Sequence, residues 1–131
     1  RFHAAAARAD FQGYFACMAP DGVFLGTDAT ERWSVPEFRA YCRPYFDQGK
    51  GWVYTPRARR VTPVVEGVAY FDEILENEKY GTCRGTGVVI KRGGAWVIGQ
   101  YSLGFMVPND VAGEVTAITK RLEGNDRKYQ Q

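Results

Sequence analysis

Three carboxylates are the candidates for proton transfer in this 131-residue chain. Asp72 and Glu73 are neighbours within a segment that predicts a strand, so only one of the two side chains can face the interior. Burial in an apolar cavity raises the pKa of a carboxyl into a range that suits proton transfer. Asp28 follows a shorter predicted strand, and there we expect it to shape a turn.

Arg84 lies in the middle of another predicted strand, where its long side chain could reach a cavity carboxylate or anchor an anionic substrate. An ion pair with Glu73 or Asp72 across the sheet is the alternative, and the two interpretations overlap. Such a pair would keep the carboxylate ionised, which favours ligand binding over a carboxyl of raised pKa. The candidate catalytic residues are therefore Glu73, Asp72 and Arg84.

Aromatic residues are numerous and histidine is scarce, with 3 Trp, 8 Tyr and 8 Phe against one His. A histidine-rich zinc site is excluded, and a Ser-His-Asp triad would have to use His3. We expect His3 to be a partly exposed surface residue near the start of the first helix. The aromatic content indicates a large core, an aromatic-lined pocket, or both.

Several aromatic and polar side chains could line or close such a pocket, although core packing alone explains any single aromatic. Gln100 and Ser102 are expected to share a face with Ile98 on the last strand, and polar groups on a core face need partners. A ligand or a buried water could supply those partners. The candidate ligand-binding residues are Tyr14, Trp33, Tyr41, Trp52, Tyr54, Gln100, Tyr101 and Ser102.

The composition argues against several other kinds of partner. A net charge of +2 is too small to require a nucleic acid, and no apolar run approaches the length of a membrane span. No pair of carboxylates has the spacing of a metal site, and Gly85 and Gly87 lack the third glycine of a dinucleotide site. We therefore predict a small-molecule ligand, with no metal, cofactor, nucleic acid or membrane partner.

The elements that must position these residues come as helices first and strands afterwards. Helices are predicted over residues 1–18 and 35–47, the second with Ser34 as its N-cap and Glu37 as the reciprocal partner. A terminal helix is predicted from residue 108 to 124. Strands are predicted over residues 23–27, 52–64, 67–76, 82–91 and 95–107. Helices that cover one face of a strongly bent antiparallel sheet make a cone with an apolar mouth.

No linker or repeat divides the chain, so we predict one domain over residues 1–124 and a frayed polar tail over 125–131. The chain starts Arg-Phe-His without a methionine, which suggests that a preceding segment has been removed. The sequence therefore does not decide the cellular compartment of the protein; the cytoplasm is favoured, and export is the alternative.

Five segments together resemble a known family, because they follow one another in a characteristic order, although no single segment is diagnostic. They are residues 21–28, 31–33, 67–73, 84–89 and 94–98. In this order, the chain from about Phe2 to Asp110 resembles the NTF2-like superfamily, in its SnoaL-like branch. The resemblance implies an α+β fold, a cone-shaped barrel in which a curved antiparallel sheet wraps around N-terminal helices. It also implies a ligand cavity inside the cone and a homodimer.

The resemblance leaves catalysis open, because the family holds isomerases, dehydratases and polyketide cyclases beside members without activity. Many relatives carry His, and Ser two residues later, on the last strand, where this chain has Ser102 and Gly104. One hypothesis is a protein that binds a small apolar or cyclic molecule, with or without cofactor-free isomerase, cyclase or dehydratase chemistry. The other is a non-catalytic dimerisation or assembly module with a vestigial or peptide-binding cavity.

Overall fold

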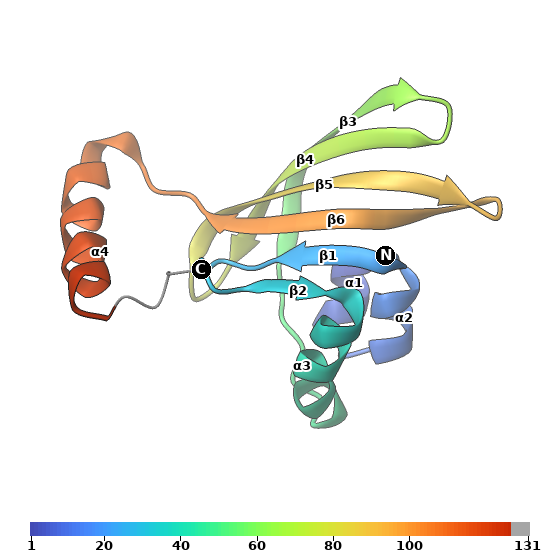
Figure 1. The fold of residues 1–131 in the computed structure, drawn as a ribbon, viewed down its shortest axis with the longest axis horizontal. Coiled ribbons are helices and arrows are strands. Elements are labelled where there is room, and N and C mark those ends of the chain that lie inside the picture. The colour runs from blue at the N-terminus through green and yellow to red at the C-terminus, as the bar shows by residue number, and fades with distance from the viewer. Residues whose placement is uncertain (127–131) are drawn as a thin grey trace.

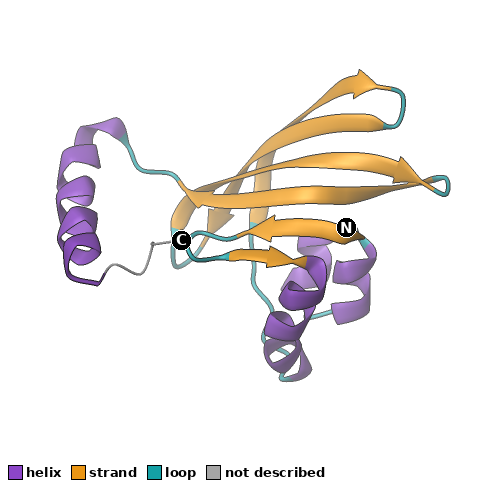
Figure 2. Cartoon of the chain, in the orientation of Figure 1, coloured by secondary structure: helices purple, strands orange, loops and turns teal. Residues whose placement is uncertain are grey.

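Three helices lie on one side of a curved, unclosed sheet in the computed structural model, which describes residues 1–126 (Figures 1 and 2). They are α1 (Phe2–Ala7), α2 (Phe11–Ala16) and α3 (Val35–Asp47). The expected α+β cone fold is therefore confirmed, with the helices on the inner face of the sheet.

Six strands form one sheet in the order β2-β1-β6-β5-β4-β3. The strands are β1 (Met18–Leu25), β2 (Arg32–Ser34), β3 (Thr55–Val65), β4 (Val68–Asn77), β5 (Gly81–Arg92) and β6 (Ala95–Phe105). All neighbours are antiparallel except β1 and β6, so the expectation of a purely antiparallel sheet is wrong. Parallel neighbours need a long connection, and the chain between β1 and β6 supplies it.

The first expected helix is broken into α1 and α2. Ala9 has a positive φ of 56°, which no α-helix contains. Directly after it, the Asp10 side chain accepts a hydrogen bond of 2.9 Å from the backbone N–H of Gly13 and so caps α2. This cap competes with continuation of the helix, and the resulting turn lets α1 lie across the inner face of the sheet.

The second expected helix is confirmed, and both residues that predicted its start take part in its N-terminal cap. Ser34 and Glu37 form a capping box, in which Glu37 N–H donates to Ser34 Oγ at 3.3 Å and Ser34 N–H donates to Glu37 Oε1 at 3.1 Å. The helix continues through Pro44 to Asp47. Its buried face includes Phe38, which stacks on Phe24 of β1 with ring centroids 4.0 Å apart.

A bulge in β6 reverses the alternation of inner and outer side chains. Val88 pairs with Gln100 and Val89 pairs with Ile98, so Gly99 is the extra residue. Ile98 and Tyr101 are consequently both buried, whereas Gln100 is exposed. Gln100 and Ser102 thus do not share a face with Ile98, and their expected place in the cavity is wrong because one inserted residue exchanges the two faces.

The C-terminal segment lies apart from the sheet (Figure 1). A short 3₁₀ helix, η1 (Asn109–Val111), leads into α4 (Ala112–Asp126), in agreement with the expected terminal helix. No helix among residues 1–126 is long and apolar enough to cross a membrane. The single domain over 1–124 stays a prediction, and residues 127–131 of the expected polar tail lie outside the described residues.

The capping box predicts a local loss of stability on replacement of Ser34. Ser34→Ala should lower the free energy of unfolding by about 1 kcal/mol, because the N–H of Glu37 loses its acceptor. Urea denaturation followed by tryptophan fluorescence measures this difference. Ser34→Thr keeps the hydroxyl and should retain most of the stability, and an equal loss in both variants would contradict a capping role.

Candidate functional site

Glu73 is a carboxylate buried in the core of the sheet. Residues of β4 alternate, so Phe71 and Glu73 point inward while Tyr70 and Asp72 are exposed on the outer face. The Glu73 residue is only 1% exposed. Of the two neighbouring candidates, the structure therefore places Glu73 inside and Asp72 on the opposite side of the sheet.

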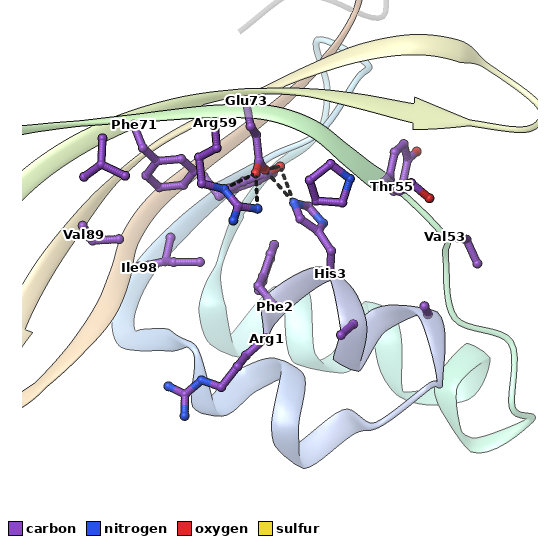
Figure 3. A pocket seen from close by; sticks show the side chains of 16 residues that line it. Arg1, Phe2, His3, Val53, Thr55, Arg59, Phe71, Glu73, Val89 and Ile98 are labelled. Carbon is purple, nitrogen blue, oxygen red and sulfur yellow. Dashed lines mark hydrogen bonds and ion pairs between the residues drawn. The ribbon is translucent and has the colours of Figure 1, made fainter.

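Three side chains donate hydrogen bonds to the Glu73 carboxylate, and Figure 3 shows two of them, His3 and Arg59, pointing toward it. Tyr101 O–H donates to Oε2 at 2.5 Å, and His3 Nε2 lies 2.6 Å from the same oxygen. Arg59 donates to the other oxygen, Oε1, from Nε at 2.9 Å and from Nη2 at 2.7 Å. Both carboxylate oxygens are thus satisfied by protein donors, as burial of a charge requires.

Each donor comes from a different element. His3 lies on α1, Arg59 lies directly opposite Glu73 on β3, and Tyr101 lies on β6. Tyr101 must reach across β5 to contact Glu73, and Gly85 of β5 leaves the space for it. A Cβ atom at Gly85 would overlap the Tyr101 hydroxyl and lie 2.7 Å from Glu73 Oε2. A residue without a side chain is therefore required at this point of the sheet.

The charge of Glu73 is fixed by these neighbours. Burial by itself would raise the pKa of the carboxyl, but hydrogen bonds from His3 and Tyr101, the charge of His3 and the hydrogen bonds from Arg59 outweigh it. The pKa of Glu73 is lowered to about 2. For Tyr101, burial first and then its bond to Glu73 raise the pKa well above the ordinary value. At neutral pH the site holds a carboxylate and a neutral phenol.

Arg59, and not Arg84 as expected from the sequence, binds the buried carboxylate of Glu73. Arg84 is exposed on the outer face of β5, opposite Ile74 and Gly104, and so cannot reach the inner carboxylate. The expected contact between Arg84 and a cavity carboxylate is wrong, because positions 83 and 85 of β5, and not 84, lie on the inner face of the sheet. The sequence shows a basic run in β3, formed by Arg57, Arg59 and Arg60, but which carboxylate Arg59 contacts depends on the register of β3 with β4.

His3 was expected as a partly exposed surface residue, and its contact with Glu73 was missed. Its side chain is 11% exposed and its Nε2 also lies 3.3 Å from the Tyr101 hydroxyl. The alanine-rich composition of α1 was the available signal. Ala5 and Ala6 are buried, and small side chains let a helix approach a sheet closely enough for a neighbouring histidine to reach it.

A cavity of about 500 Å³, the first cavity, opens beside this cluster (Figure 3). Its wall is mainly apolar, and its polar groups include His3, Arg59 and Glu73. The apolar side chains that line it include Phe2, Val61, Phe71, Val89 and Ile98. An apolar space with a few converging polar groups has the form and size of a small-molecule site.

The predicted ligand-binding aromatics are divided between this space and another. Tyr101 lines the first cavity, and Tyr54 lines both. Trp33, Tyr41 and Trp52 line a second cavity of about 840 Å³, which shares residues 53–55 with the first. Tyr14 lines neither and is buried against Phe2, with the stacked rings 4.4 Å apart.

The remaining acidic candidate has the local role expected of it. The Asp28 carboxylate accepts hydrogen bonds from the N–H and the hydroxyl of Thr30, at 2.9 and 2.8 Å, and so shapes the turn before β2. Within the described part of the chain, no group of three or more His, Cys, Asp or Glu side chains is placed to hold a metal ion.

Comparison with known sequences decides the family. The SnoaL-like domain matches residues 1–108, which include the whole sheet and every residue of the Glu73 cluster. The chain belongs to the SnoaL-like domain family. A comparison with curated proteins found no match. The matched region ends before α4 begins.

Solved structures share the fold at low sequence identity. An NTF2-like protein of unknown function from Pseudomonas putida KT2440 has a TM-score of 0.68 and 16% identity, over 85% of this chain and 83% of that chain. A domain of unknown function with a cystatin-like fold from Nostoc punctiforme PCC 73102 has a TM-score of 0.69 and 15% identity, over 97% and 91%. A candidate ketosteroid isomerase from Shewanella frigidimarina NCIMB 400 has a TM-score of 0.61 and 20% identity, over 78% and 87%.

The lowered pKa of Glu73 predicts an acid-sensitive fold. Because the folded pKa lies near 2 and the ordinary value is 4.5, the stabilisation is complete above pH 4.5 and is lost as the pH falls towards 2. The loss should be on the order of 3 kcal/mol in the free energy of unfolding. Glu73→Gln should be less stable at neutral pH and lack this part of the pH dependence in urea denaturation. Glu66→Gln, in the exposed β3–β4 turn, should keep it; equal pH dependence in all three proteins would contradict the assignment.

The close approach at Gly85 predicts a second effect on stability. Gly85→Ala should lower the free energy of unfolding by about 2 kcal/mol, because the added methyl group displaces the Tyr101 hydroxyl from Glu73. Gly104→Ala is the matched control on the neighbouring strand, since a Cβ atom there meets nothing within 4 Å. Urea denaturation of both variants measures the difference, and similar stabilities would show that the space at Gly85 is not required.

Proposed function

We propose that the first cavity binds a small, mainly apolar cyclic molecule and that His3 transfers a proton to and from it without a cofactor. The observation that carries the proposal is the pairing of His3 with a buried, ionised Glu73 at the wall of an apolar cavity. A carboxylate in this position fixes the orientation of the imidazole ring and the ring nitrogen that carries the proton, as the acid of a catalytic triad does.

Glu73 itself is a poor candidate for the proton transfer. With a pKa of about 2, it is neither a proton donor near neutral pH nor a strong base. The raised pKa considered for a cavity carboxyl does not apply, because His3, Tyr101 and Arg59 all favour the ionised form. Glu73 therefore acts in the proposal as the residue that positions His3.

His3 has one ring nitrogen left for a ligand. Its Nε2 is used by Glu73 and Tyr101, and within the described residues Nδ1 has no hydrogen-bond partner. No buried side-chain nitrogen or oxygen is left without a partner in this part of the chain, so Nδ1 is open to solvent or ligand. In the proposal, Nδ1 takes a proton from a carbon beside a carbonyl group and returns it at another carbon of the same molecule.

Arg59 is placed to stabilise the negative charge that such a proton transfer creates on the ligand. Its side chain is 48% exposed at the cavity, and only Nε and Nη2 are bonded to Glu73. The remaining N–H groups can donate to the oxygen of an enolate, which carries the charge while the proton is on His3. An isomerase or a related cyclase or dehydratase is the class of enzyme that this arrangement favours.

A non-catalytic assembly module is the second candidate, and the C-terminal helix favours it. Ile118 and Leu122 of α4 are 58% and 50% exposed, and the helix lies outside the matched domain. Tyr70 and Trp96 are exposed on the sheet at 51% and 47%. A homodimer that covers these apolar side chains would be the corresponding assembly.

The test uses cyclohex-3-enone, a small cyclic ketone whose conversion to the conjugated cyclohex-2-enone is followed by ultraviolet absorbance. We expect His3→Gln to lower the rate at least a hundredfold, as loss of a general base does. Arg84→Gln, on the outer face, should keep the wild-type rate. A wild-type rate in His3→Gln would remove His3 from the proton transfer. No turnover by the wild-type protein, together with a dimer in solution, would favour the assembly module.

A further inference from the structure

The second cavity has a different chemistry from the first. It lies between α3 and β2 on one side and the β4–β5 turn on the other, and its volume of about 840 Å³ is sufficient for a small molecule. Seven of its lining side chains are aromatic. The first cavity has two arginines, a histidine and one glutamate at its wall, whereas the second has three glutamates and one lysine.

The aromatic wall is continuous. The Trp33 ring stacks on Tyr41 at 4.7 Å and on Phe38 at 5.3 Å, measured between ring centroids. Trp52 extends the wall, with its centroid 6.5 Å from that of Phe38. Tyr41 is 41% exposed, so ring surface is available to a ligand as well as to the core. Ring faces carry partial negative charge and attract cations.

Glu31 places a carboxylate beside this wall without a cationic partner. Its Oε1 accepts a hydrogen bond of 2.9 Å from the backbone N–H of Asp28, and Gly26 N–H donates to its carbonyl oxygen at 2.8 Å. A Cβ atom at Gly26 would lie 2.7 Å from Oε1, so the glycine makes room for the carboxylate. Among the residues that the structure describes, no ion pair involves Glu31, whereas Glu76 is paired with Arg57 at 2.8 Å.

An ammonium group of the protein already lies on a ring at the rim. Lys79 Nζ is 5.2 Å from the ring centroid of Tyr80, and both residues line the cavity. This distance is within the range of an attractive contact between a cation and an aromatic face. The cavity wall therefore offers to a ligand the same kind of contact that its own lysine makes.

We propose that the second cavity is a binding site for an organic cation, a small molecule whose ammonium group lies against Trp33 and Tyr41 and whose charge is balanced by Glu31. Simple metal ions do not fit, because they require several oxygen ligands and, among the described residues, no group of three or more His, Cys, Asp or Glu side chains is placed to hold one. An ammonium group with alkyl substituents combines the charge that Glu31 attracts with the apolar surface that the rings bury.

The titration of two tyrosines supports the sign of the charge. Burial first, and then the charges of Cys83, Tyr80 and Glu31, raise the pKa of Tyr54 to about 12. Burial also raises the pKa of Tyr41, with Tyr45 and Glu31 adding to the effect. The negative charge of Glu31 is thus felt at two rings of the cavity wall, where it disfavours a second negative charge and favours a positive one.

Choline and its uncharged isostere 3,3-dimethylbutan-1-ol test the proposal, because they differ mainly in the charge of the head group. Isothermal titration calorimetry of the whole chain should give a Kd for choline at least fivefold lower than for the alcohol, the ratio expected for one contact between a cation and an aromatic wall. Equal affinities, or no choline binding at millimolar concentration, would overturn the proposal.

Two variants locate the binding. Glu31→Gln keeps an oxygen for the Asp28 N–H but removes the charge, and should weaken choline about fivefold while the alcohol is unaffected. Tyr41→Leu removes an exposed ring and should weaken choline by a similar factor. Glu66→Gln, which removes an equal charge at the β3–β4 turn, should change neither Kd. Unchanged choline binding in Glu31→Gln and Tyr41→Leu would place any bound choline elsewhere and overturn the assignment.

Discussion

A single buried carboxylate determines how the parts of this fold fit together. Glu73 is 1% exposed, and an ionised carboxylate in such a place costs several kcal/mol unless donors surround it. Its donors come from the first helix, from the edge strand and from a strand two places away. The hydrogen bonds to this one charge therefore require three features of the fold: the docking of α1, the register of β3 and β4, and the glycine at position 85. Satisfying that charge also leaves polar groups at the wall of an apolar space, and the candidate site is the result.

The sequence patterns that predicted the structure correctly involve residues close together in the chain. Ser34 and Glu37 act within one helical turn, and Gly93 and Gly94, with φ values of 57° and 80°, allow the tight turn between β5 and β6 where the sequence predicted it. Strand alternation limited the inner carboxylate to one of two neighbours, and burial shows that it is Glu73. The order of these elements was sufficient for the family and the fold, because each step depends on residues close together in the chain.

The contacts that could not be predicted from the sequence depend on residues far apart in the chain, or on a bulge that shifts the alternation of inner and outer side chains along a strand. Arg59 and Arg84 both occupy strands beside β4, and only the register with Glu73 and the side that each residue faces distinguish them. One inserted residue, Gly99, moves Gln100 and Ser102 to the outer face, and no local pattern separates such a bulge from a regular strand. His3 reaches Glu73 across 70 residues of sequence because Ala9 ends α1 with a positive φ.

Residues 53–55 form part of the wall of both cavities. Tyr54 is half-buried between two spaces: the wall of one holds two arginines, a histidine and one glutamate, and the wall of the other holds three glutamates and a lysine. The two cavities therefore share a wall, and the position of the Tyr54 side chain contributes to the shape of both.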